Sequence, residues 1–348
     1  MKKVTWTSPS NIALVKYWGK WGVQLPRNPS LSFTLKHSVT TLSIIAFKKK
    51  TLDTIPSLVF LFEEKPHHKF QEKIEKFLKT QELRFPWLLN YSLEIHSSNT
   101  FPHSSGIASS ASSMSALCLS LLSLDELIGE KKYETSDFYM LASELSRLAS
   151  GSASRSVYGG QVFWGESSLL NNSSDKYAIP FHESHPIFQD YCDSILIVDE
   201  GEKSLSSRAG HTLMDKHPFS KQRYQEAQNN LAKLVEALKK GDIESFIEVV
   251  EDEALMLHAL MMTSRPSFIL LKGQSLSLIE KIRNFRLQQN IPVCFTIDAG
   301  PNIHLLYPQK YKMIVLEWIE KDLSFLLTGN KWIHDEVGEG PHLLEAAL

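Results

Sequence analysis

The sequence predicts an α+β fold divided into two lobes. Its 348 residues are enough for two domains, or for one large bilobed unit with an ample core. Strand-like and helix-like patterns alternate through the first half, and a new apolar strand opens the second half near residue 194. Hydrophobic residues make up 43% and charged residues 22% of the chain, which is typical of a globular protein.

The first half begins with strands and continues with helices. Residues 39–47 and 58–62 are rich in β-branched and aromatic side chains, which favours strands. Residues 70–78 have a helical pattern, and residues 91–96 alternate like a half-buried strand. A loop of small residues over 102–113 then leads into an apolar helix, one face of which carries Met114, Leu117, Cys118, Leu121 and Leu122.

A second helix is expected to begin at an N-cap, Ser136, and to end in another small-residue loop at 150–155. Its inward residues would be Phe138, Leu141, Leu145 and Leu148. A short strand at 161–164 follows that loop. The boundary between the lobes is expected near residues 185–192.

The second half is predicted to hold a strand at 194–199, two amphipathic helices and a third helix near 276–285. Residues 293–298 and 303–307 form a plausible strand pair around a turn at 299–302. The inward faces of the first two helices would carry Ala227, Leu231, Leu234, Leu238, Ile243, Phe246, Ile247, Val250 and Leu257. We expect the acidic run 248–253 to lie on the solvated face of its helix.

Composition argues against several classes of function. Lys and Arg total 37 and Asp and Glu total 39, and the net charge of -2 indicates neither a nucleic-acid partner nor a membrane surface. The three cysteines form no CxxC pair and are expected to be buried thiols in a reducing compartment. Because no signal-peptide core or apolar run of ~20 residues is evident, a cytoplasmic protein is expected.

The loop at 102–113 has the features of an anion site. Hydroxyl and glycine residues before a helix leave backbone N–H groups free, and the helix dipole favours negative charge there. Phosphate would suit that geometry. The alternative is a serine-rich helix start with no ligand, which is equally common for such a segment in isolation.

Two cationic segments could serve the same anion. Lys16 and Lys20 bracket the Tyr17-Trp18-Gly19 kink, although an edge strand with solvated lysines would have the same pattern. In the loop at 150–155, small residues let the backbone approach a ligand, and the planar fork of an arginine can hold a carboxylate or phosphate. A helix C-terminus with a surface arginine is the alternative there.

An acidic residue, Asp298, follows an apolar strand and precedes the turn at 299–302. A carboxylate in that place could face a cleft. Taken alone, the segment is better explained as an Asx-type turn that caps the strand end.

Together these segments resemble the diphosphomevalonate decarboxylase family of the GHMP kinase superfamily. The motifs are Lys16-Tyr-Trp-Gly-Lys20, Pro102-x-x-x-Gly106-x-x-Ser109-Ser110-Ala111, Ser150-Gly-Ser-Ala-x-Arg155 and Asp298-Ala-Gly-Pro-Asn302. Segments 28–32, 206–208 and 258–268 also resemble the family. The likeness extends from about residue 8 to residue 307, and the phosphate loop by itself marks only the superfamily.

The resemblance implies a fold, a reaction and its cofactors. The fold would have a nucleotide-binding lobe over residues 1–190 and a ferredoxin-like α/β lobe over 191–348, around a deep cleft. The enzyme would use ATP and Mg²⁺ to phosphorylate the tertiary hydroxyl of 5-diphosphomevalonate. Loss of phosphate and CO₂ would then give isopentenyl diphosphate. Family members are commonly homodimers, so a homodimer is expected.

The resemblance also implies roles for individual residues. Asp298 would orient or deprotonate the C3 hydroxyl, and Lys16 would neutralise charge near Asp298 and the transferring phosphoryl group. Arg155 would hold the substrate carboxylate, and Asn11 would orient Arg155. The expected substrate-binding residues are Tyr17, Trp18, Gly19, Lys20, Lys69, Ser150, Gly151, Ser152, Ala153, Ser154, Arg155, Ser207 and Arg208. The expected ATP-binding residues are Pro102, Ser105, Gly106, Ile107, Ala108, Ser109 and Ser110. The resemblance leaves the Mg²⁺ ligands open.

Three departures from the family pattern leave other activities in consideration. His103-Ser104-Ser105 replaces the usual Thr-Ala-Ala, Pro29 replaces a common serine, and His211 replaces a common methionine. The alternatives are a monophosphate decarboxylase, a kinase of the 3-hydroxyl, and a non-catalytic phosphate-binding module. The joint presence of Lys16, Arg155 and Asp298 favours decarboxylation.

Overall fold

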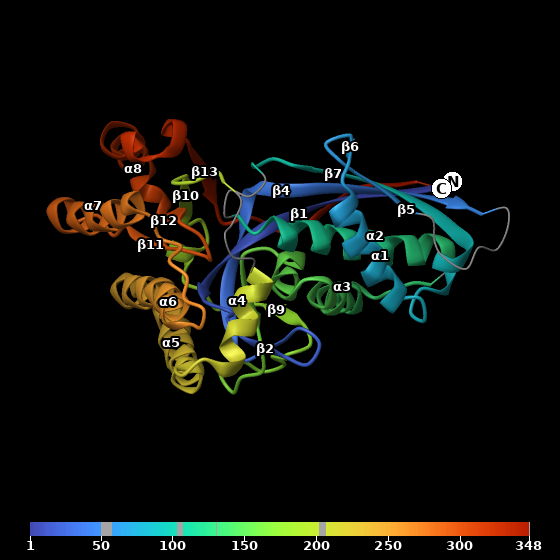
Figure 1. Ribbon diagram of the computed structural model, residues 1–348, viewed down its shortest axis with the longest axis horizontal. Helices are drawn as coiled ribbons and strands as arrows, with labels where there is room; N and C mark the ends of the chain where they lie inside the picture. Colours follow the sequence, from blue (N-terminus) through green and yellow to red (C-terminus); the bar gives the residue numbers. More distant parts are fainter. Residues whose placement is uncertain (50–57, 103–106, 130, 202–206, 348) are drawn as a thin grey trace.

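The computed structural model describes residues 1–49, 58–102, 107–129, 131–201 and 207–347, except for the side chains of Ser207 and Arg208. It confirms a mixed α+β architecture (Figure 1). The strands are β1 (Lys2–Val15), β2 (Lys20–Trp21), β3 (Leu25–Pro26), β4 (Ser30–Lys48), β5 (Leu58–Phe62), β6 (Lys65–Pro66), β7 (Tyr91–Asn99), β8 (Gln161–Trp164), β9 (Ala178–Pro180), β10 (Cys192–Leu196), β11 (Cys294–Thr296), β12 (Ile303–Tyr307), β13 (Trp332–Glu336) and β14 (His342–Ala347). The helices are α1 (His68–Thr80), α2 (Ser109–Gly129), α3 (Thr135–Ala149), α4 (Ser207–Leu213), α5 (Ser220–Lys240), α6 (Ile243–Thr263), α7 (Gly273–Gln289) and α8 (Lys312–Trp318), with a 3₁₀ helix, η2, at Gly151–Val157.

The larger sheet forms the first lobe. Its strand order is β14-β1-β4-β7-β5-β6, and β8 and β9 continue from β4. The pairs are antiparallel except for β5 with β7. Helices α2 and α3 lie along this sheet, and both chain termini meet at its far end (Figure 1). The last strand, β14, therefore returns the chain to the first sheet, and the proposed division between residues 190 and 191 stays a prediction.

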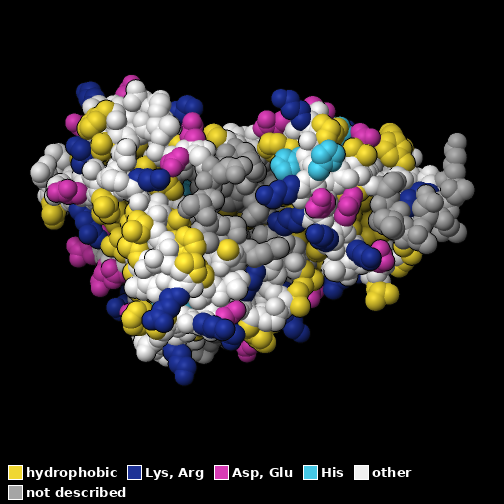
Figure 2. Space-filling model, in the orientation of Figure 1, with side chains coloured by type: hydrophobic (Ala, Val, Ile, Leu, Met, Phe, Trp, Pro, Cys, Tyr) yellow, Lys and Arg dark blue, Asp and Glu magenta, His cyan; other side chains and the backbone are white. Residues whose placement is uncertain are grey.

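The second lobe is a four-stranded antiparallel sheet with the order β11-β12-β10-β13. Helices α6 and α7 pack against β11, and α5 packs against α6. Acidic and basic side chains are interspersed over the face shown in Figure 2.

One of the apolar clusters spans the two lobes. Separate clusters of buried side chains lie between α2, α3 and the large sheet, and between α7, α8 and the small sheet. A third cluster combines β1 and β4 side chains with those of α5 and α6, for example Leu14 and Phe33 with Leu234 and Val250. This shared cluster places the end of β1 against the second lobe.

Helix α2 corrects the expectation of an apolar stripe on one face. Every residue from Ala111 to Asp125 is buried, so the helix is enclosed on all sides. Its serines bind the sheet, because Ser115 Oγ is 2.5 Å from Ser8 Oγ and Ser112 Oγ is 2.6 Å from Thr40 Oγ1. By length and composition α2 could cross a membrane, but 83% of its apolar window is buried inside the protein.

The structure confirms most predicted elements and corrects several boundaries. The helix expected to begin at Ser136 begins at Thr135, with Glu134 as an N-cap that makes no side-chain hydrogen bond. The loop at 102–113 ends earlier than expected, because α2 begins at Ser109. The strand expected at 194–199 is β10, which begins two residues earlier, at Cys192, and already ends at Leu196. Helix α8 and the strands β13 and β14 have no counterpart among the predicted elements.

Candidate active site

The end of β1 and the turn after β11 bring two predicted residues together. Lys16 Nζ is 2.8 Å from Asp298 Oδ1. The Lys16 side chain is 2% exposed and the Asp298 side chain is 29% exposed, so the carboxylate is the accessible member of the pair. The pair can therefore present an oriented carboxylate to a ligand.

A buried ion pair holds the backbone of Lys16. Its N–H donates to Glu253 Oε2 at 2.8 Å, and its carbonyl accepts from Arg223 Nη2 at 3.1 Å and Asn28 Nδ2 at 3.1 Å. The Arg223 guanidinium meets both Glu253 oxygens, at 2.6 and 2.7 Å. Asn230 Nδ2 donates to the same carboxylate at 2.9 Å.

These contacts correct the expectation for the acidic run 248–253. Glu253 is fully buried, and Glu251 is buried beside Arg283 and Arg286. Only part of the run faces solvent. Burial raises the pKa of the Glu253 carboxyl, but the Arg223 charge and the surrounding hydrogen bonds leave that pKa below its usual value.

The backbone of Asp298 is also held in place. His258 Nε2 is 3.1 Å from its carbonyl oxygen. The next turn is tied to β10, because Asn302 Oδ1 accepts from the N–H groups of Val198 and Asp199 at 2.8 and 2.9 Å. The turn predicted at the strand end therefore exists, while the Asp298 side chain is directed to Lys16.

Arg155 lies in η2, buried and pre-oriented. Its Nε donates to Asn11 Oδ1 at 3.2 Å and its Nη1 donates to Ser30 Oγ at 2.6 Å. Its guanidinium carbon is 5.6 Å from the ring centre of Trp164. Burial lowers the pKa of Arg155 to about 10, partly offset by the charge of Asp298, so the group remains a cation at neutral pH.

The Tyr17-Trp18-Gly19 kink encloses His211. The His211 ring centre is 4.3 Å from that of Tyr17 and 4.8 Å from that of Trp18, and its Nδ1 accepts from the Gly19 N–H at 3.0 Å. Gly19 has φ +92°, and a Cβ there would meet the Tyr224 ring, so only glycine suits the position. Trp18 packs into an apolar cluster that includes Met214.

The hydroxyl of Tyr17 is a buried polar atom, and it makes no hydrogen bond within the part of the chain that the structure describes. A Cβ added at Gly151 would lie 2.8 Å from this oxygen. Burial raises the pKa of the Tyr17 phenol well above its ordinary value, so the hydroxyl is available as a donor.

The loop at 150–154 has an inner and an outer part. Ala153 and Ser154 are fully buried, and Ser154 Oγ donates to the Gly151 carbonyl at 2.9 Å. Ser150 and Ser152 are partly exposed, and the Ser152 carbonyl accepts from Asn11 Nδ2 at 3.2 Å. Among these residues, the two partly exposed serines are the better placed to reach a ligand.

The expected phosphate cradle is described only in part, because Ser105 and Gly106 lie outside the described residues, as do His103 and Ser104. Ser109 and Ser110 form the first turn of α2 and are partly exposed, whereas Ile107 is buried. The Ser109 N–H donates to the Ile107 carbonyl at 2.6 Å and the Ala111 N–H to the Ala108 carbonyl at 2.8 Å. Two backbone N–H groups that were expected to be free for a ligand are therefore already hydrogen-bonded within the chain.

The remaining predicted residues lie on other segments of the chain. Lys20 Nζ donates to Gln24 Oε1 at 3.0 Å in the β2–β3 hairpin. Lys69 is exposed in the first turn of α1, and Pro102 is exposed after β7. Ser207 and Arg208 begin α4, and the description does not include their side chains.

Sequence reasoning overlooked several residues of the site. Ser30 and Trp164 contact Arg155, and Glu253 and Arg223 hold Lys16. The segment 28–32 resembles the family and residues 161–164 have a strand pattern, but neither feature identifies Ser30 or Trp164 as a contact of the arginine. The signal for Glu253 was its apolar neighbours at helical spacing, which place it on the buried face of α6.

Two family models match the chain, and together they span both lobes. The diphosphomevalonate decarboxylase-like N-terminal domain matches residues 8–178. The mevalonate 5-diphosphate decarboxylase C-terminal domain matches residues 194–344.

Individual proteins show the same similarity. The diphosphomevalonate decarboxylase of Gibberella zeae is 30% identical over 89% of this chain and 82% of its own length. That of Debaryomyces hansenii is 28% identical over 91% of this chain and 82% of its own. The mevalonate diphosphate decarboxylase of Staphylococcus aureus superposes with a TM-score of 0.84, at 28% identity, over 99% of this chain and 98% of its own. A complex of MDDEF with MVAPP, AMPPCP and magnesium superposes with a TM-score of 0.83, at 26% identity, over 99% of each chain.

Proposed function

The chain belongs to the diphosphomevalonate decarboxylase family, and from this membership we propose how its residues carry out the family's reaction. The enzyme is an ATP-dependent decarboxylase of the mevalonate pathway. Its substrate is 5-diphosphomevalonate and its product is isopentenyl diphosphate. One observation carries the assignment of roles: the accessible Asp298 carboxylate is paired with buried Lys16, and its charge acts on buried Arg155.

The first step transfers the γ-phosphoryl group of ATP to the C3 hydroxyl. We assign Asp298 to accept the hydroxyl proton as the oxygen forms its bond to phosphorus and ADP leaves. Lys16 keeps the carboxylate oriented and offsets negative charge beside the transferring group. Because phosphoryl transfer depends on positioning and charge stabilisation, the rigid hold on the Lys16 backbone supports this role.

The second step breaks two bonds of the phosphorylated intermediate. Phosphate leaves with the electron pair of the C3–O bond, and the bond to the carboxylate breaks to release CO₂ and form the alkene. Arg155 would hold that carboxylate, and its pre-orientation by Asn11 and Ser30 supports this assignment. A fixed guanidinium keeps the breaking bond aligned with the departing phosphate.

The residues at the site are suited to Mg²⁺ bound together with ATP. Mg²⁺ prefers oxygen ligands and usually takes only one or two from the protein, the rest coming from phosphate and water. The hydroxyls of Ser109 and Ser110, in the partly exposed first turn of α2, are oxygen donors of this kind. When bound, the ion would neutralise charge on the ATP phosphates, and we propose these residues as its protein ligands.

The diphosphate end of the substrate requires donors, and we propose Tyr17, Ser150, Ser152 and Lys20. The Tyr17 hydroxyl supports this proposal because it is a buried donor without a hydrogen bond among the described residues. Ser207, Arg208 and Lys69 stay predictions for the same group. The segment 105–110 stays the predicted ATP phosphate loop.

A substrate comparison tests the proposed reaction. The protein is incubated with ATP-Mg²⁺ and either mevalonate 5-diphosphate or mevalonate 5-phosphate, and CO₂ and ADP are measured. Equal amounts of CO₂ and ADP from the diphosphate, with little from the monophosphate, are expected. CO₂ mainly from the monophosphate would indicate a monophosphate decarboxylase, ADP without CO₂ a kinase, and neither product a binding module.

We also propose that the protein acts in the cytoplasm as a homodimer, as the family resemblance implies. Sedimentation velocity at several protein concentrations tests the second point. A species of twice the chain mass at micromolar concentration is expected, and a monomer throughout would contradict it.

A further inference from the structure

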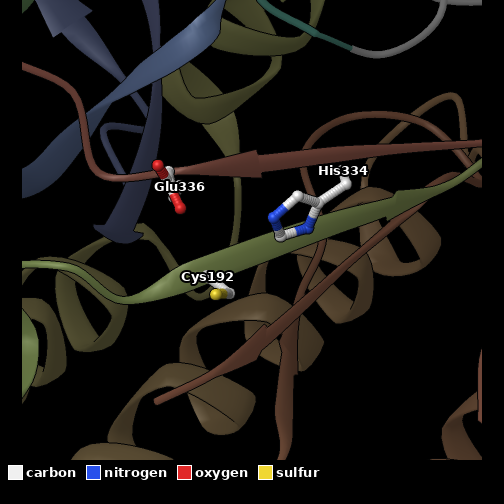
Figure 3. A group of neighbouring side chains, drawn as sticks. All are labelled: Cys192, His334 and Glu336. Carbon is white, nitrogen blue, oxygen red and sulfur yellow. The ribbon is translucent and has the colours of Figure 1, made fainter. Parts of the chain in front are cut away.

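A cluster of three side chains lies away from the active site, on the sheet of the second lobe. Cys192 of β10 is paired with Glu336 of β13, and Ser194 is paired with His334. Alternation along the strands puts Cys192, His334 and Glu336 on one face of the sheet. One potential ligand atom from each lies within 4.8 Å of the others. Figure 3 shows the imidazole directed toward the space between Glu336 and Cys192.

Two polar atoms of this cluster lack hydrogen bonds within the described chain. His334 Nε2 and Glu336 Oε2 are both buried, and Glu336 is 8% exposed. The other ring nitrogen, His334 Nδ1, is 3.5 Å from both Ser194 Oγ and Tyr307 Oη. Glu336 Oε2 has only the Lys312 ammonium, at 3.7 Å. Because buried polar atoms are nearly always paired, His334 Nε2, which has no partner among the described residues, indicates a missing one.

We propose that Cys192, His334 and Glu336 form a zinc site. A thiolate, an imidazole and a carboxylate are all common Zn²⁺ ligands, and three of them leave one tetrahedral position for water. The thiol releases its proton to solvent when the Zn–S bond forms, so that thiolate and carboxylate together balance the charge of the ion. The sulfur and nitrogen donors distinguish this site from the oxygen donors proposed for Mg²⁺.

Two lysines beside Glu336 would compete with the ion for its carboxylate. Lys36 Nζ is 2.7 Å from Glu336 Oε1, and Lys312 Nζ is 3.7 Å from Oε2. Zn²⁺ must therefore displace the Lys312 ammonium from the ligand oxygen. Lys312 also lines a cavity of about 500 Å³ together with Asp190 and Lys310, which gives its side chain space to move.

The site would strengthen the connection between the two lobes. A zinc ion would join β10 directly to β13. The residue between two of the ligands, Asp335, accepts hydrogen bonds from the N–H groups of Lys36, His37 and Ser38 at 2.7–2.9 Å, and so holds the middle of β4. Zinc bound at His334 and Glu336 would stabilise this contact.

Metal titration of the full-length protein tests the proposal. The protein is dialysed against a chelator and titrated with Zn²⁺ in competition with a chromophoric chelator, and with Co²⁺ as a spectroscopic probe. One saturable equivalent per chain is expected, and the Co²⁺ form should show a thiolate-to-metal charge-transfer band. Replacement of one ligand, in Cys192→Ala or His334→Gln, should lower zinc affinity on the order of 100-fold.

Two further variants provide controls. Cys118→Ala removes an equally buried thiol from α2 and should leave zinc affinity unchanged. Lys312→Met removes the competing ammonium and should raise zinc affinity about tenfold. The proposal is overturned if the wild type binds no saturable equivalent, or if its affinity survives in both Cys192→Ala and His334→Gln, as an adventitious surface site would. The His334→Gln variant keeps the test valid if Cys192→Ala fails to fold.

Discussion

Lys16 and Asp298 are separated by 282 residues, yet their side chains meet at 2.8 Å. Each side chain comes from a different lobe, and the apolar cluster that spans both lobes aligns the two strands, β1 and β11, that precede these residues. Formation of this ion pair therefore depends on the alignment of the lobes. For the same reason, the geometry of the site depends on the stability of the fold.

Replacing Asp298 by asparagine should abolish turnover with little effect on ATP affinity. The substitution removes the charge and the proton acceptor but preserves the size of the side chain. A loss of about 10²–10⁴-fold in kcat is expected if the carboxylate acts as a general base. CO₂ release measures the first effect and fluorescent-nucleotide titration the second. Near-normal CO₂ release would remove Asp298 from the proposed mechanism.

The Arg155→Lys variant should lose rate and become sensitive to alkaline pH. Lysine cannot reproduce the separate contacts to Asn11 and Ser30, and a misplaced cation can cost about 100-fold in kcat. Burial lowers the pKa of Arg155 from 12.5 to about 10, so it stays charged. The same burial acting on a lysine, with an ordinary pKa of about 10.4, would neutralise it nearer to pH 7.

The pH dependence of kcat distinguishes these two effects in Arg155→Lys. The variant should decline with rising pH well before the wild type does, while ATP affinity stays unchanged. Parallel pH profiles at a uniformly reduced rate would show that geometry alone was lost. An unchanged kcat would contradict the assigned role.

The buried Glu253–Arg223 pair should be essential for stability as well as for the position of Lys16. Glu253→Gln leaves the Arg223 cation without a counter-charge, and breaking such a pair typically costs about 3–5 kcal/mol. Urea denaturation measures this loss. Asp252→Asn, at an exposed position on the same helix, is the matched control and should change stability little.

A double variant separates the two roles of this pair. Arg223→Met with Glu253→Met removes both charges and should recover part of the stability. It should not recover kcat, because the hydrogen bonds to the Lys16 backbone are still absent. Full recovery of kcat would show that the pair has no positioning role.

The sequence could predict local elements well, because their patterns are local. The alternation at 91–96 and the helical spacing at Ala227, Leu231 and Leu234 correspond to β7 and α5. The orientation of the helix over 114–122 was harder to predict, because a helix that is buried on all sides has no polar face to define it. The strand β14 was missed because its partner is β1, at the other end of the chain.

The residues of the candidate site also differ in how well the sequence predicts them. Asp298, Arg155 and Lys16 stand out because charged residues in small-residue or apolar segments are unusual. The residues that hold them in place do not stand out in the sequence. Glu253, for example, can be buried only because it pairs with Arg223, a residue on another helix. Ser30 looks like an ordinary strand serine until η2 brings Arg155 to it.

Two buried histidines should make stability fall with acid. Burial lowers the pKa of His211 to about 3 and that of His258 to about 4, both below the unfolded value of 6.5. Between these values the unfolded chain binds more protons than the folded chain, so stability is complete above pH 6.5 and is lost as the pH falls below it. The slope contributed by each histidine is about 1.4 kcal/mol per pH unit.

The variant His211→Met isolates one of these contributions, since it introduces the residue that the family commonly has. Its unfolding free energy, measured between pH 4.5 and 8, should depend less steeply on pH below 6.5 than that of the wild type. It should also be lower at pH 8, because the Gly19 N–H loses its acceptor. Identical slopes below pH 6.5 would contradict the buried neutral state of His211.

Tyr17→Phe should weaken substrate binding without destabilising the protein. The Tyr17 hydroxyl is buried and makes no hydrogen bond to any described residue, so its loss should cost the fold nothing. A hydrogen bond from this hydroxyl to a charged diphosphate is worth about 1.5–3 kcal/mol, or roughly 10–150-fold in KM. Tyr191→Phe is the matched control, because its hydroxyl is also buried without a hydrogen bond among the described residues, while its ring packs beside Phe188 and Phe246. If both variants leave KM unchanged, the Tyr17 hydroxyl does not bind the diphosphate.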